Sequence, residues 1–201
     1  EAPVVILATG TYLRSVIHIG ELQYESGPQG QHTAVALAEN LAELLPVARF
    51  KTGTPPRVNL RSLDYDKLEK LPGENNIPGF SFETEAIEIE QVPCWVTYTT
   101  PETHRIIREN LHRTSMYSGQ ITGPGPRYCP SIESKIVEFP NKESHQVFVE
   151  PEGWETKEGY LSGCSTSLPL EIQEEMLKTT PGFENVEIMR PAYAIEYDCI
   201  D

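Results

Sequence analysis

The sequence predicts a mixed α/β fold, and three observations support this class. Residues 4–7 form a short apolar run rich in β-branched residues that ends in Ala-Thr-Gly, which is typical of a buried parallel strand entering a glycine turn. An amphipathic helical pattern follows at 32–45, and a further strand is expected at 47–50. Beyond residue 61, alternating strands and capped helices replace this pattern. We expect part of a doubly wound, Rossmann-like layer followed by a mixed α+β region.

The bulk composition fits one globular domain, or one domain with a piece of another. The chain has 201 residues, of which 38% are hydrophobic. No apolar run approaches the roughly 18–20 residues that span a bilayer, and no basic segment precedes the first apolar run as in a signal peptide. We therefore expect no membrane association. Because that run begins at residue 4, we expect the chain to be an internal part of a larger protein.

The charge and the cysteines narrow the function further. A net charge of −14 argues against a surface that binds a phosphate backbone throughout, so a nucleic-acid contact would need a local basic patch. The four cysteines are scattered and contain no Cys-x-x-Cys pair, which disfavours a zinc site and a disulfide framework. We expect no metal and a reducing compartment such as the cytoplasm.

The first elements surround a glycine-rich and a basic segment. Residues 20–33 read as a loop, and Pro46 ends the helix predicted at 32–45. The segment 49–61 holds four cations and no acid, so its sequence KTGTPPR could contact phosphate or could be a solvated junction. The composition changes after it, and we place a domain boundary at about 51–60.

The middle of the chain reads as strands and one capped helix. Alternation predicts strands at 80–82, 87–89 and 94–99, with Cys94 in the core of the last one. Thr-Pro-Glu at 100–102 starts a helix that runs to about 113. Its basic face, which contains Arg105, could meet RNA phosphates or simply face water.

The last third reads as a hairpin, a helix and two closing strands. We expect strands at 135–139 and 145–149 around a turn, a helix at 168–179, and strands at 186–189 and 193–195. Two carboxylates, Glu150 and Glu152, could bind a cofactor hydroxyl or mark a polar hairpin end.

A Gly-Pro loop at 123–130 is the strongest candidate site. Alternating Gly and Pro make a rigid turn whose backbone can approach a ligand closely. Arg127 lies two residues before Cys129, where its charge can favour the nucleophilic thiolate. The residues alone leave two interpretations open, a reactive thiol beside an anion site and an ordinary surface turn with an incidental cysteine.

Six motifs in order resemble one family. They are KTGTPPR at 51–57, QVPCWVTYT at 91–99, GPRYCPSIESKIVEF at 125–139, VEPEG at 149–153, STSLP at 165–169 and RPAYAIEYD at 190–198. The chain resembles the glucose-inhibited division protein A family, the large subunit of an enzyme that modifies the wobble uridine of certain tRNAs. The family's amino-terminal dinucleotide fingerprint and its carboxy-terminal helical domain have no counterpart in this sequence.

The resemblance implies a function and a division of the chain. The parent would use FAD, reduced by NADH, and a one-carbon unit from methylene-tetrahydrofolate to install an aminomethyl-type group on C5 of uridine. It would act on tRNA with a GTPase partner subunit and as a homodimer. Residues 1–50 would be a partial FAD-binding segment, 51–195 an inserted NADH-binding α+β domain, and 196–201 the return to the FAD domain. The excerpt alone should have little activity.

The resemblance also implies site residues. Thr9, Gly10 and Lys51 would lie near the flavin, and so would Thr33 and Ala34, although this loop departs from the commonest family pattern. The NAD stretch is Gly125, Pro126, Arg127, Tyr128, Cys129, Pro130, Ser131, Ile132, Glu133, Ser134, Lys135, Ile136, Val137, Glu138 and Phe139. Arg127 would pair with a phosphate, and Glu133 and Lys135 would position ribose or phosphate. Cys129 would be catalytic, because a thiolate added at C6 of uracil turns C5 into a nucleophile.

Three alternatives remain. One is a folate-dependent tRNA uridine C5 methyltransferase, which shares the thiol and flavin logic. Another is a non-catalytic module that docks tRNA or the partner. The last is a thiol hydrolase, for which His145 is the nearest candidate base.

Overall fold

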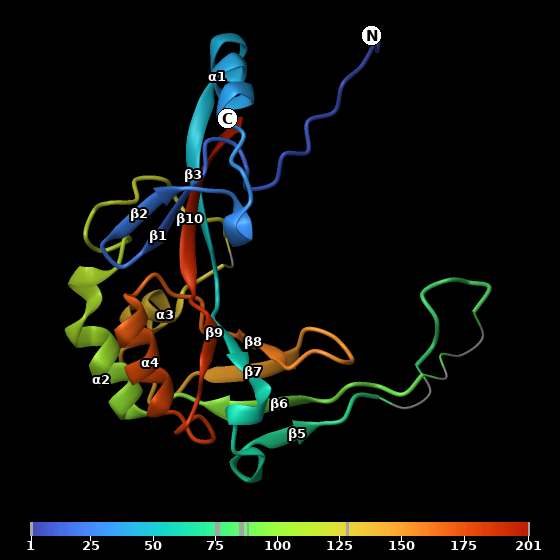
Figure 1. Cartoon of the computed structure of the whole chain (residues 1–201), viewed down its shortest axis with the longest axis vertical. Helices are drawn as coiled ribbons and strands as arrows, with labels where there is room; N and C mark the ends of the chain where they lie inside the picture. The colour runs from blue at the N-terminus through green and yellow to red at the C-terminus, as the bar shows by residue number, and fades with distance from the viewer. Residues whose placement is uncertain (1, 75–76, 85–86, 88, 128, 201) are drawn as a thin grey trace.

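The computed structural model describes residues 2–74, 77–84, 87, 89–127 and 129–200, and these form two β-sheets with helices (Figure 1). The four-stranded sheet has the order β2-β1-β10-β3, and the six-stranded sheet has the order β5-β6-β7-β8-β4-β9. Every pairing found in the two sheets is antiparallel. The mixed α/β class is therefore confirmed, whereas the expected parallel, doubly wound strip is not what these residues form.

The elements have the following bounds. The four-stranded sheet contains β1 (Val16–Ile19), β2 (Leu22–Glu25), β3 (Val47–Thr54) and β10 (Tyr193–Ile200). The six-stranded sheet contains β4 (Arg57–Asn59), β5 (Glu69–Leu71), β6 (Cys94–Tyr98), β7 (Gln146–Pro151), β8 (Glu158–Ser162) and β9 (Ile188–Arg190). The α-helices are α1 (Val35–Leu44), α2 (Pro101–Glu109), α3 (Ile132–Glu138) and α4 (Leu170–Lys178), and single 3-10 turns lie at Pro28–Gly30, Leu60–Ser62, Tyr65–Lys67 and Leu111–Arg113.

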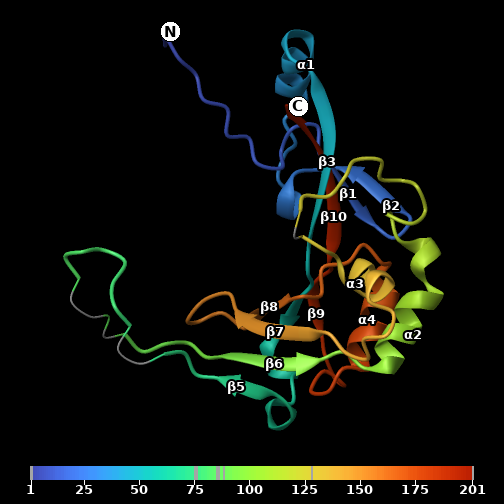
Figure 2. The same ribbon diagram turned by 180° about the vertical axis from the view of Figure 1, so that it is seen from behind.

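The main hydrophobic core lies between the six-stranded sheet and helices α2, α3 and α4, which gather beside one another in Figure 2. Its strands contribute Val58, Val147, Val149 and Leu161, and its helices contribute Ile106, Ile107, Ile132, Ile136, Ile172, Met176 and Leu177. This core fixes α3 and the loop before it against a rigid support.

A buried glutamine ties α4 to the chain between β9 and β10. The side-chain amide of Gln173 donates to the carbonyls of Leu168 (2.7 Å) and Ala192 (3.0 Å), and its oxygen accepts the Ala192 N–H (2.7 Å). Gln173 therefore satisfies backbone groups at the point where the chain passes from one sheet to the other.

Far fewer buried hydrophobic residues pack beside the four-stranded sheet. Its cluster of buried hydrophobic residues consists of Leu13, Ala38 and Leu41, packed around α1. The strand predicted at 4–7 is wrong, because these residues are exposed and form no strand. An apolar run becomes a strand only where it has partners to pair with and a core to enter, and the described residues offer neither to 4–7.

One two-stranded ribbon runs through both sheets. Strands β3 and β10 pair in the four-stranded sheet, and their continuations β4 and β9 pair in the six-stranded sheet. The chain changes sheet at Pro55-Pro56 and again at Pro191-Ala192. The predicted limits of 1–50, 51–195 and 196–201 remain predictions, but the sheets themselves change at these two dipeptides.

Several other element predictions need correction. Residues 135–139 are helical rather than a strand, because the Ser131 hydroxyl caps α3 by accepting the Ser134 N–H (3.3 Å) and Ile132 and Ile136 share its buried face. The hairpin is therefore β7–β8. The segment 20–33 read as a loop holds β2, and 80–82 form no strand. The prediction at 87–89 includes residue 88, which lies outside the described residues.

Candidate functional site

The Gly-Pro loop is anchored along the edge of β3. The Lys51 N–H donates to the Pro124 carbonyl (3.0 Å), and the N–H groups of Thr122 and Gly123 donate to the Glu196 carboxylate (3.0 and 2.9 Å). A Cβ at Gly123 would lie 2.7 Å from the Arg49 carbonyl oxygen, so only glycine permits this approach. The loop is thus held by backbone contacts that its composition alone did not specify.

Glu196 on β10 is the anchor that sequence reasoning missed. It is buried and forms an ion pair with Arg49 at 3.0 Å. Burial raises the pKa of its carboxyl, but the Gly123 N–H, Arg49 and the Thr122 N–H together bring that pKa below its ordinary value. Glu196 therefore holds the loop as a carboxylate. The sequence signal that could have pointed to Glu196 is the group of three charged residues in the motif 190–198, namely Arg190, Glu196 and Asp198.

Cys129 lies exposed at the end of this loop, where two clefts meet. It lines a cleft of about 630 Å³ and another of about 410 Å³, and its Sγ lies 3.5 Å from Thr52 Oγ1. The larger cleft also has Lys135, His145, Phe148 and Tyr160 in its walls. The thiol is therefore accessible from two sides, which a nucleophile requires.

Lys51 is a buried cation beside the thiol. Lys51 is only 5% exposed, and it lines the 410 Å³ cleft together with Cys129. Burial lowers the pKa of its ammonium group, and the charges of Glu133 and Cys129 act in the opposite direction. The sequence predicts a cofactor or phosphate contact for Lys51, and in the structure Lys51 lines the same cleft as Cys129.

The predicted stretch 125–139 divides between cleft and core. The members that line the 410 Å³ cleft are Gly125, Pro126, Cys129, Pro130, Ser131, Ser134, Glu138 and Phe139. Lys135 lines the 630 Å³ cleft and donates to the Gly163 carbonyl (3.2 Å), while Ile132 and Ile136 are core residues. Arg127 and Val137 are exposed, and Tyr128 lies outside the described residues.

Glu133 points inward rather than to solvent. Its residue is 1% exposed, and its Oε1 accepts hydrogen bonds from the Thr166 hydroxyl (2.6 Å) and the Ser167 N–H (3.0 Å). Among the described residues its Oε2 has no hydrogen-bond partner. Glu133 thus links α3 to the loop 165–169, a geometry that differs from the open contact with ribose or phosphate that we expected.

Four of the five residues expected near the flavin do not line the clefts at Cys129, and their contact with flavin stays a prediction. Thr9 and Gly10 line a separate pocket of about 180 Å³ with Asp198, and this pocket shares no residue with the two clefts at Cys129. The Thr33 hydroxyl accepts the Ser15 N–H (2.6 Å) and donates to the Tyr12 carbonyl (2.9 Å). Ala34 precedes α1 and packs on its small core. The hydroxyl of Thr33 is therefore already used within the protein.

His145 shares the larger cleft with Cys129 but is a poor base at neutral pH. Its ring lies 5.3 Å from that of His104, and both residues are buried. Burial, with help from His104 and two lysines, lowers the pKa of His145 to about 4. Its Nε2 makes no hydrogen bond to any described residue. His145 therefore does not provide the oriented base that the thiol hydrolase alternative requires.

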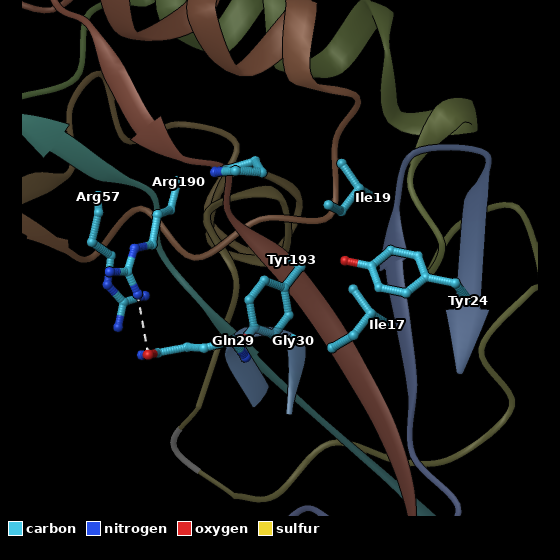
Figure 3. A pocket seen from close by; sticks show the side chains of 9 residues that line it. Ile17, Ile19, Tyr24, Gln29, Gly30, Arg57, Arg190 and Tyr193 are labelled. Atoms are coloured by element: carbon cyan, nitrogen blue, oxygen red, sulfur yellow. Dashed lines mark hydrogen bonds between the residues drawn. The ribbon is translucent and has the colours of Figure 1, made fainter. Parts of the chain in front are cut away.

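A further pocket of about 260 Å³ lies between the two sheets, and we call it the inter-sheet pocket (Figure 3). It is lined by Ile17, Ile19, Tyr24, Gln29, Gly30, Arg57, Arg190, Pro191 and Tyr193. Burial and the neighbouring phenol of Tyr193 raise the pKa of Tyr24. Sequence reasoning missed this pocket because its walls come from three stretches far apart in the chain, within 17–30, at Arg57 and within 190–193.

The described residues offer neither a clustered metal site nor a membrane-spanning helix. They contain no group of three or more His, Cys, Asp or Glu side chains that could hold a metal ion. None of their helices is long and apolar enough to cross a membrane.

Comparison with known proteins decides the family. The family model described as "Glucose inhibited division protein A" matches residues 1–201. This chain belongs to the glucose inhibited division protein A family. Its mixed α/β fold agrees with that membership.

The relatives are similar along the whole chain. A protein of Bacillus thuringiensis strain Al Hakam named "tRNA uridine 5-carboxymethylaminomethyl modification enzyme MnmG" is 56% identical over 200 residues, which is 99% of this chain and 32% of the relative. A protein of the same name from Alkaliphilus metalliredigens is 58% identical over 198 residues, 98% of this chain and 31% of the relative. The chain thus spans about a third of the length of these relatives.

Solved structures agree with the sequence relatives. Aquifex aeolicus GidA in its form II crystal matches with a TM-score of 0.85 and 48% identity, over 96% of this chain and 31% of that one. The form I crystal of the same protein gives 0.85 and 52% identity, over 96% and 33% of the two chains. The family's fold is therefore retained here in detail.

Proposed function

We propose that this chain forms the thiol-bearing part of an FAD-dependent enzyme that modifies C5 of the wobble uridine in tRNA. The proposal is supported by family membership, by relatives named as tRNA uridine modification enzymes, and above all by one observation. Cys129 is exposed between two clefts on a loop fixed to β3 and Glu196. A placement of this kind suits a nucleophile that must reach a base brought in from solution.

The proposed chemistry is addition followed by elimination. The thiolate of Cys129 bonds to C6 of uracil, and the electron pair of the C5–C6 double bond moves to the C4 carbonyl as an enolate. C5 then bonds to the methylene carbon of the N5-iminium form of methylene-tetrahydrofolate, and the electron pair of the C=N double bond moves to N5 of the folate. Loss of the C5 proton and departure of the thiolate restore the double bond, so that the enzyme recovers its sulfur unchanged.

Lys51 and Thr52 support that step from β3. The Lys51 ammonium group is buried beside the sulfur, where a positive charge stabilises a thiolate more than it would in water. Thr52 Oγ1, at 3.5 Å, can donate to the anionic sulfur. Both residues belong to the KTGTPPR motif, which gives that motif a role toward the thiol in addition to any role toward cofactor.

The residues present also fit the two cofactors. The 630 Å³ cleft combines Lys135 and Lys142 with the rings of Phe148 and Tyr160, a set suited to the phosphates and the planar rings of NADH. Gly10 has a φ of 54°, which suits a glycine where the backbone must approach a ligand closely, as in the pocket we assign to FAD. When bound, the flavin would supply two-electron redox chemistry beside the one-carbon unit, and NADH would be the source of its electrons.

The remaining parts of the proposal come from the family. The whole protein would act in the cytoplasm on tRNA, as a homodimer and with a GTPase partner subunit. Residues 1–50 and 196–201 would belong to the FAD domain, and 51–195 would form the NADH-binding insertion.

The experiment traps the thiol on its target in the full-length protein that contains these residues. An anticodon stem-loop with 5-fluorouridine at the wobble position has no C5 proton to lose, so addition of Cys129 should leave a covalent complex detectable by mass. We expect this complex with the unsubstituted protein and with Cys94→Ala, and none with Cys129→Ala, which should still bind FAD. A normal level of modified tRNA from Cys129→Ala would remove the thiol from the mechanism.

A second measurement separates the enzyme from a docking module. We expect NADH to bind the protein and Arg127→Ala to weaken that binding, because a guanidinium suits a dinucleotide phosphate. Glu143→Gln, an exposed change on the loop before β7, is the matched control. A protein that ignores NADH altogether would favour the docking module.

A further inference from the structure

The inter-sheet pocket contains a charge arrangement that folding alone does not favour. Arg57 on β4 and Arg190 on β9 lie directly opposite each other in the sheet register. Like charges in such a pair are destabilising. Each arginine is held by its own glutamate, Arg57 by Glu152 (2.8 Å) and Arg190 by Glu158 (2.9 Å). This strand pairing places two guanidinium groups at one end of the pocket, and two carboxylates balance their charge.

Arg57 is pre-oriented and keeps a donor to spare. The Arg57 side chain is mostly buried, its guanidinium lies 4.6 Å from the Tyr160 ring centroid, and it donates to the Pro55 carbonyl (3.0 Å) and to the Thr54 hydroxyl. Its Nη2 takes no part in the hydrogen bonds made between described residues. A fixed donor with free capacity is what a ligand site needs, because little order must be gained on binding.

A strained residue supports the second arginine. Gln29 has a φ of 54°, in the left-handed region that glycine favours, and its side-chain oxygen accepts from Arg190 at 3.1 Å (Figure 3). Its own N–H donates to the Tyr193 hydroxyl (3.3 Å). Backbone strain of this kind persists where the surroundings enforce it and occurs often at ligand sites.

The other end of the pocket is aromatic and aliphatic. Ile17 and Ile19 lie between Tyr24 and Tyr193, and the Tyr24 hydroxyl points toward the Tyr193 side of the pocket in Figure 3. A flat ring can lie against these side chains, since aromatic and branched surfaces give large contact area at low entropic cost. The cavity of about 260 Å³ is too small for a folded peptide segment but large enough for a single ring system.

We propose that the inter-sheet pocket binds a planar heterocycle with ring carbonyl groups, held by stacking at the tyrosine end and by hydrogen bonds from Arg57 and Arg190. The two glutamates balance the two arginines, so the pocket favours a neutral ring with acceptor oxygens over a bare phosphate. An unpaired nucleobase of RNA has this chemistry, and so does the ring of a free flavin.

The pocket adjoins the thiol site. Tyr193 also lines a small pocket of about 10 Å³ together with Cys129 and Lys51, and Tyr160, which packs on Arg57, lines the 630 Å³ cleft. A nucleobase in the inter-sheet pocket would therefore be a neighbour of the base that Cys129 attacks. This RNA source rests on the proposed function, whereas the ring chemistry of the pocket does not.

Binding to this chain tests the proposal without any turnover. The probes are a fluorescently labelled anticodon stem-loop RNA, followed by anisotropy, and FAD, followed by its own fluorescence. The variants are Tyr24→Leu and Arg190→Gln, and the control is Tyr98→Leu. Tyr24 and Tyr98 are 43% and 45% exposed, and Tyr98 lies on β6 away from every cleft described above.

We expect Tyr24→Leu and Arg190→Gln each to weaken one probe about tenfold, the loss typical of a removed base–aromatic stack, and Tyr98→Leu to change neither. Loss for RNA alone identifies a nucleobase as the occupant, and loss for FAD alone identifies the flavin. Tyr24→Phe keeps the ring and should bind as the unsubstituted chain does, which separates stacking from misfolding.

Three results would overturn the proposal. They are no binding of either probe to the unsubstituted chain, unchanged affinities in both pocket variants, and equal losses with Tyr98→Leu. None of them bears on the 5-fluorouridine complex of Cys129, so the proposed function would stand or fall separately.

Discussion

The two sheets of this protein are stabilised in different ways. The six-stranded sheet and its helices share a cluster of seventeen buried apolar residues among those described, whereas the cluster beside the four-stranded sheet has three. The four-stranded sheet relies instead on charge, with Asp198 bound by Arg14 and Arg49 (both 2.9 Å) and Glu196 bound by Arg49. The comparison teaches that the site joins a well-packed support to a sheet that has a small apolar cluster and several buried or half-buried ion pairs.

This difference assigns roles to the two sides of the site. The packed side carries α3 and the cleft walls, which fixes their positions. The other side carries β3 and β10, and with them Lys51, Thr52 and Glu196. A change in the charge of Glu196 therefore acts directly on the loop that carries Cys129, because the Glu196 carboxylate accepts hydrogen bonds from N–H groups of that loop.

The largest expected effect compares the same substitution in the two regions. Leu161→Ala removes a fully buried side chain from the main core and should lower the free energy of unfolding by about 4 kcal/mol. Leu41→Ala, in the small cluster, should cost about 2 kcal/mol or less, because solvent and neighbours can fill its space. Urea unfolding followed by circular dichroism gives both values. Equal losses would mean that the two regions are packed alike.

The next effect tests the joint between the regions. Gln173→Leu removes three hydrogen bonds and leaves backbone groups of Leu168 and Ala192 without partners, so we expect a loss of about 3 kcal/mol. Hydrogen exchange should show faster opening at Ala192 than in β7. Glu174→Gln, one residue along α4 and exposed, should change neither measurement. An unaltered exchange rate at Ala192 would show that the joint does not depend on this side chain.

The effect that is smallest near neutral pH depends on pH and belongs to the packed side. Because the pKa of His145 is lowered to about 4, the unfolded chain takes up a proton below pH ~6.5 while the folded chain does not. This contribution to stability is complete above pH ~6.5 and is lost as the pH falls toward 4, by at most about 1.4 kcal/mol per pH unit. His104, whose pKa is also lowered by burial, acts in the same direction.

His145→Leu isolates that contribution. The difference in unfolding free energy between the variant and the unsubstituted protein should change with pH between 6.5 and 4 and stay constant from 7 to 8. A flat difference over the whole range would show that His145 titrates in the folded protein as it does in the unfolded chain.

The sequence predicted the parts whose signals are local. The Thr-Pro-Glu start of α2 is confirmed as a capping box at Thr100, and the aromatic and β-branched run at 94–99 is β6. These elements follow from residues that touch their immediate neighbours, and tertiary contacts do not overrule them. The family was also recognisable, because its motifs are written in consecutive residues.

The errors arose where distant residues decide. The strand expected at 135–139 became α3, since Ser131 caps a helix there and the core accepts Ile132 and Ile136 on one face. The cofactor contact expected of Lys51 stays a prediction. What the sequence could not show is that Lys51 shares a cleft with Cys129, because that depends on the hydrogen bond between the Lys51 N–H of β3 and the Pro124 carbonyl of the later loop. The site assignment itself stays a prediction until the adduct and binding experiments are done.

The ribbon that runs through both sheets links two neighbouring recesses, the inter-sheet pocket and the site of Cys129. Its crossings at Pro55-Pro56 and Pro191-Ala192 lie side by side. A bend at these crossings would move Arg57 and Arg190 relative to Tyr24. The same bend would turn the end of β3 that carries Lys51 and Thr52. A flat ring seated between the sheets would fix that bend. Occupancy of one recess would then set how the sulfur is presented in the other, so that a correctly placed neighbouring base becomes a condition for attack.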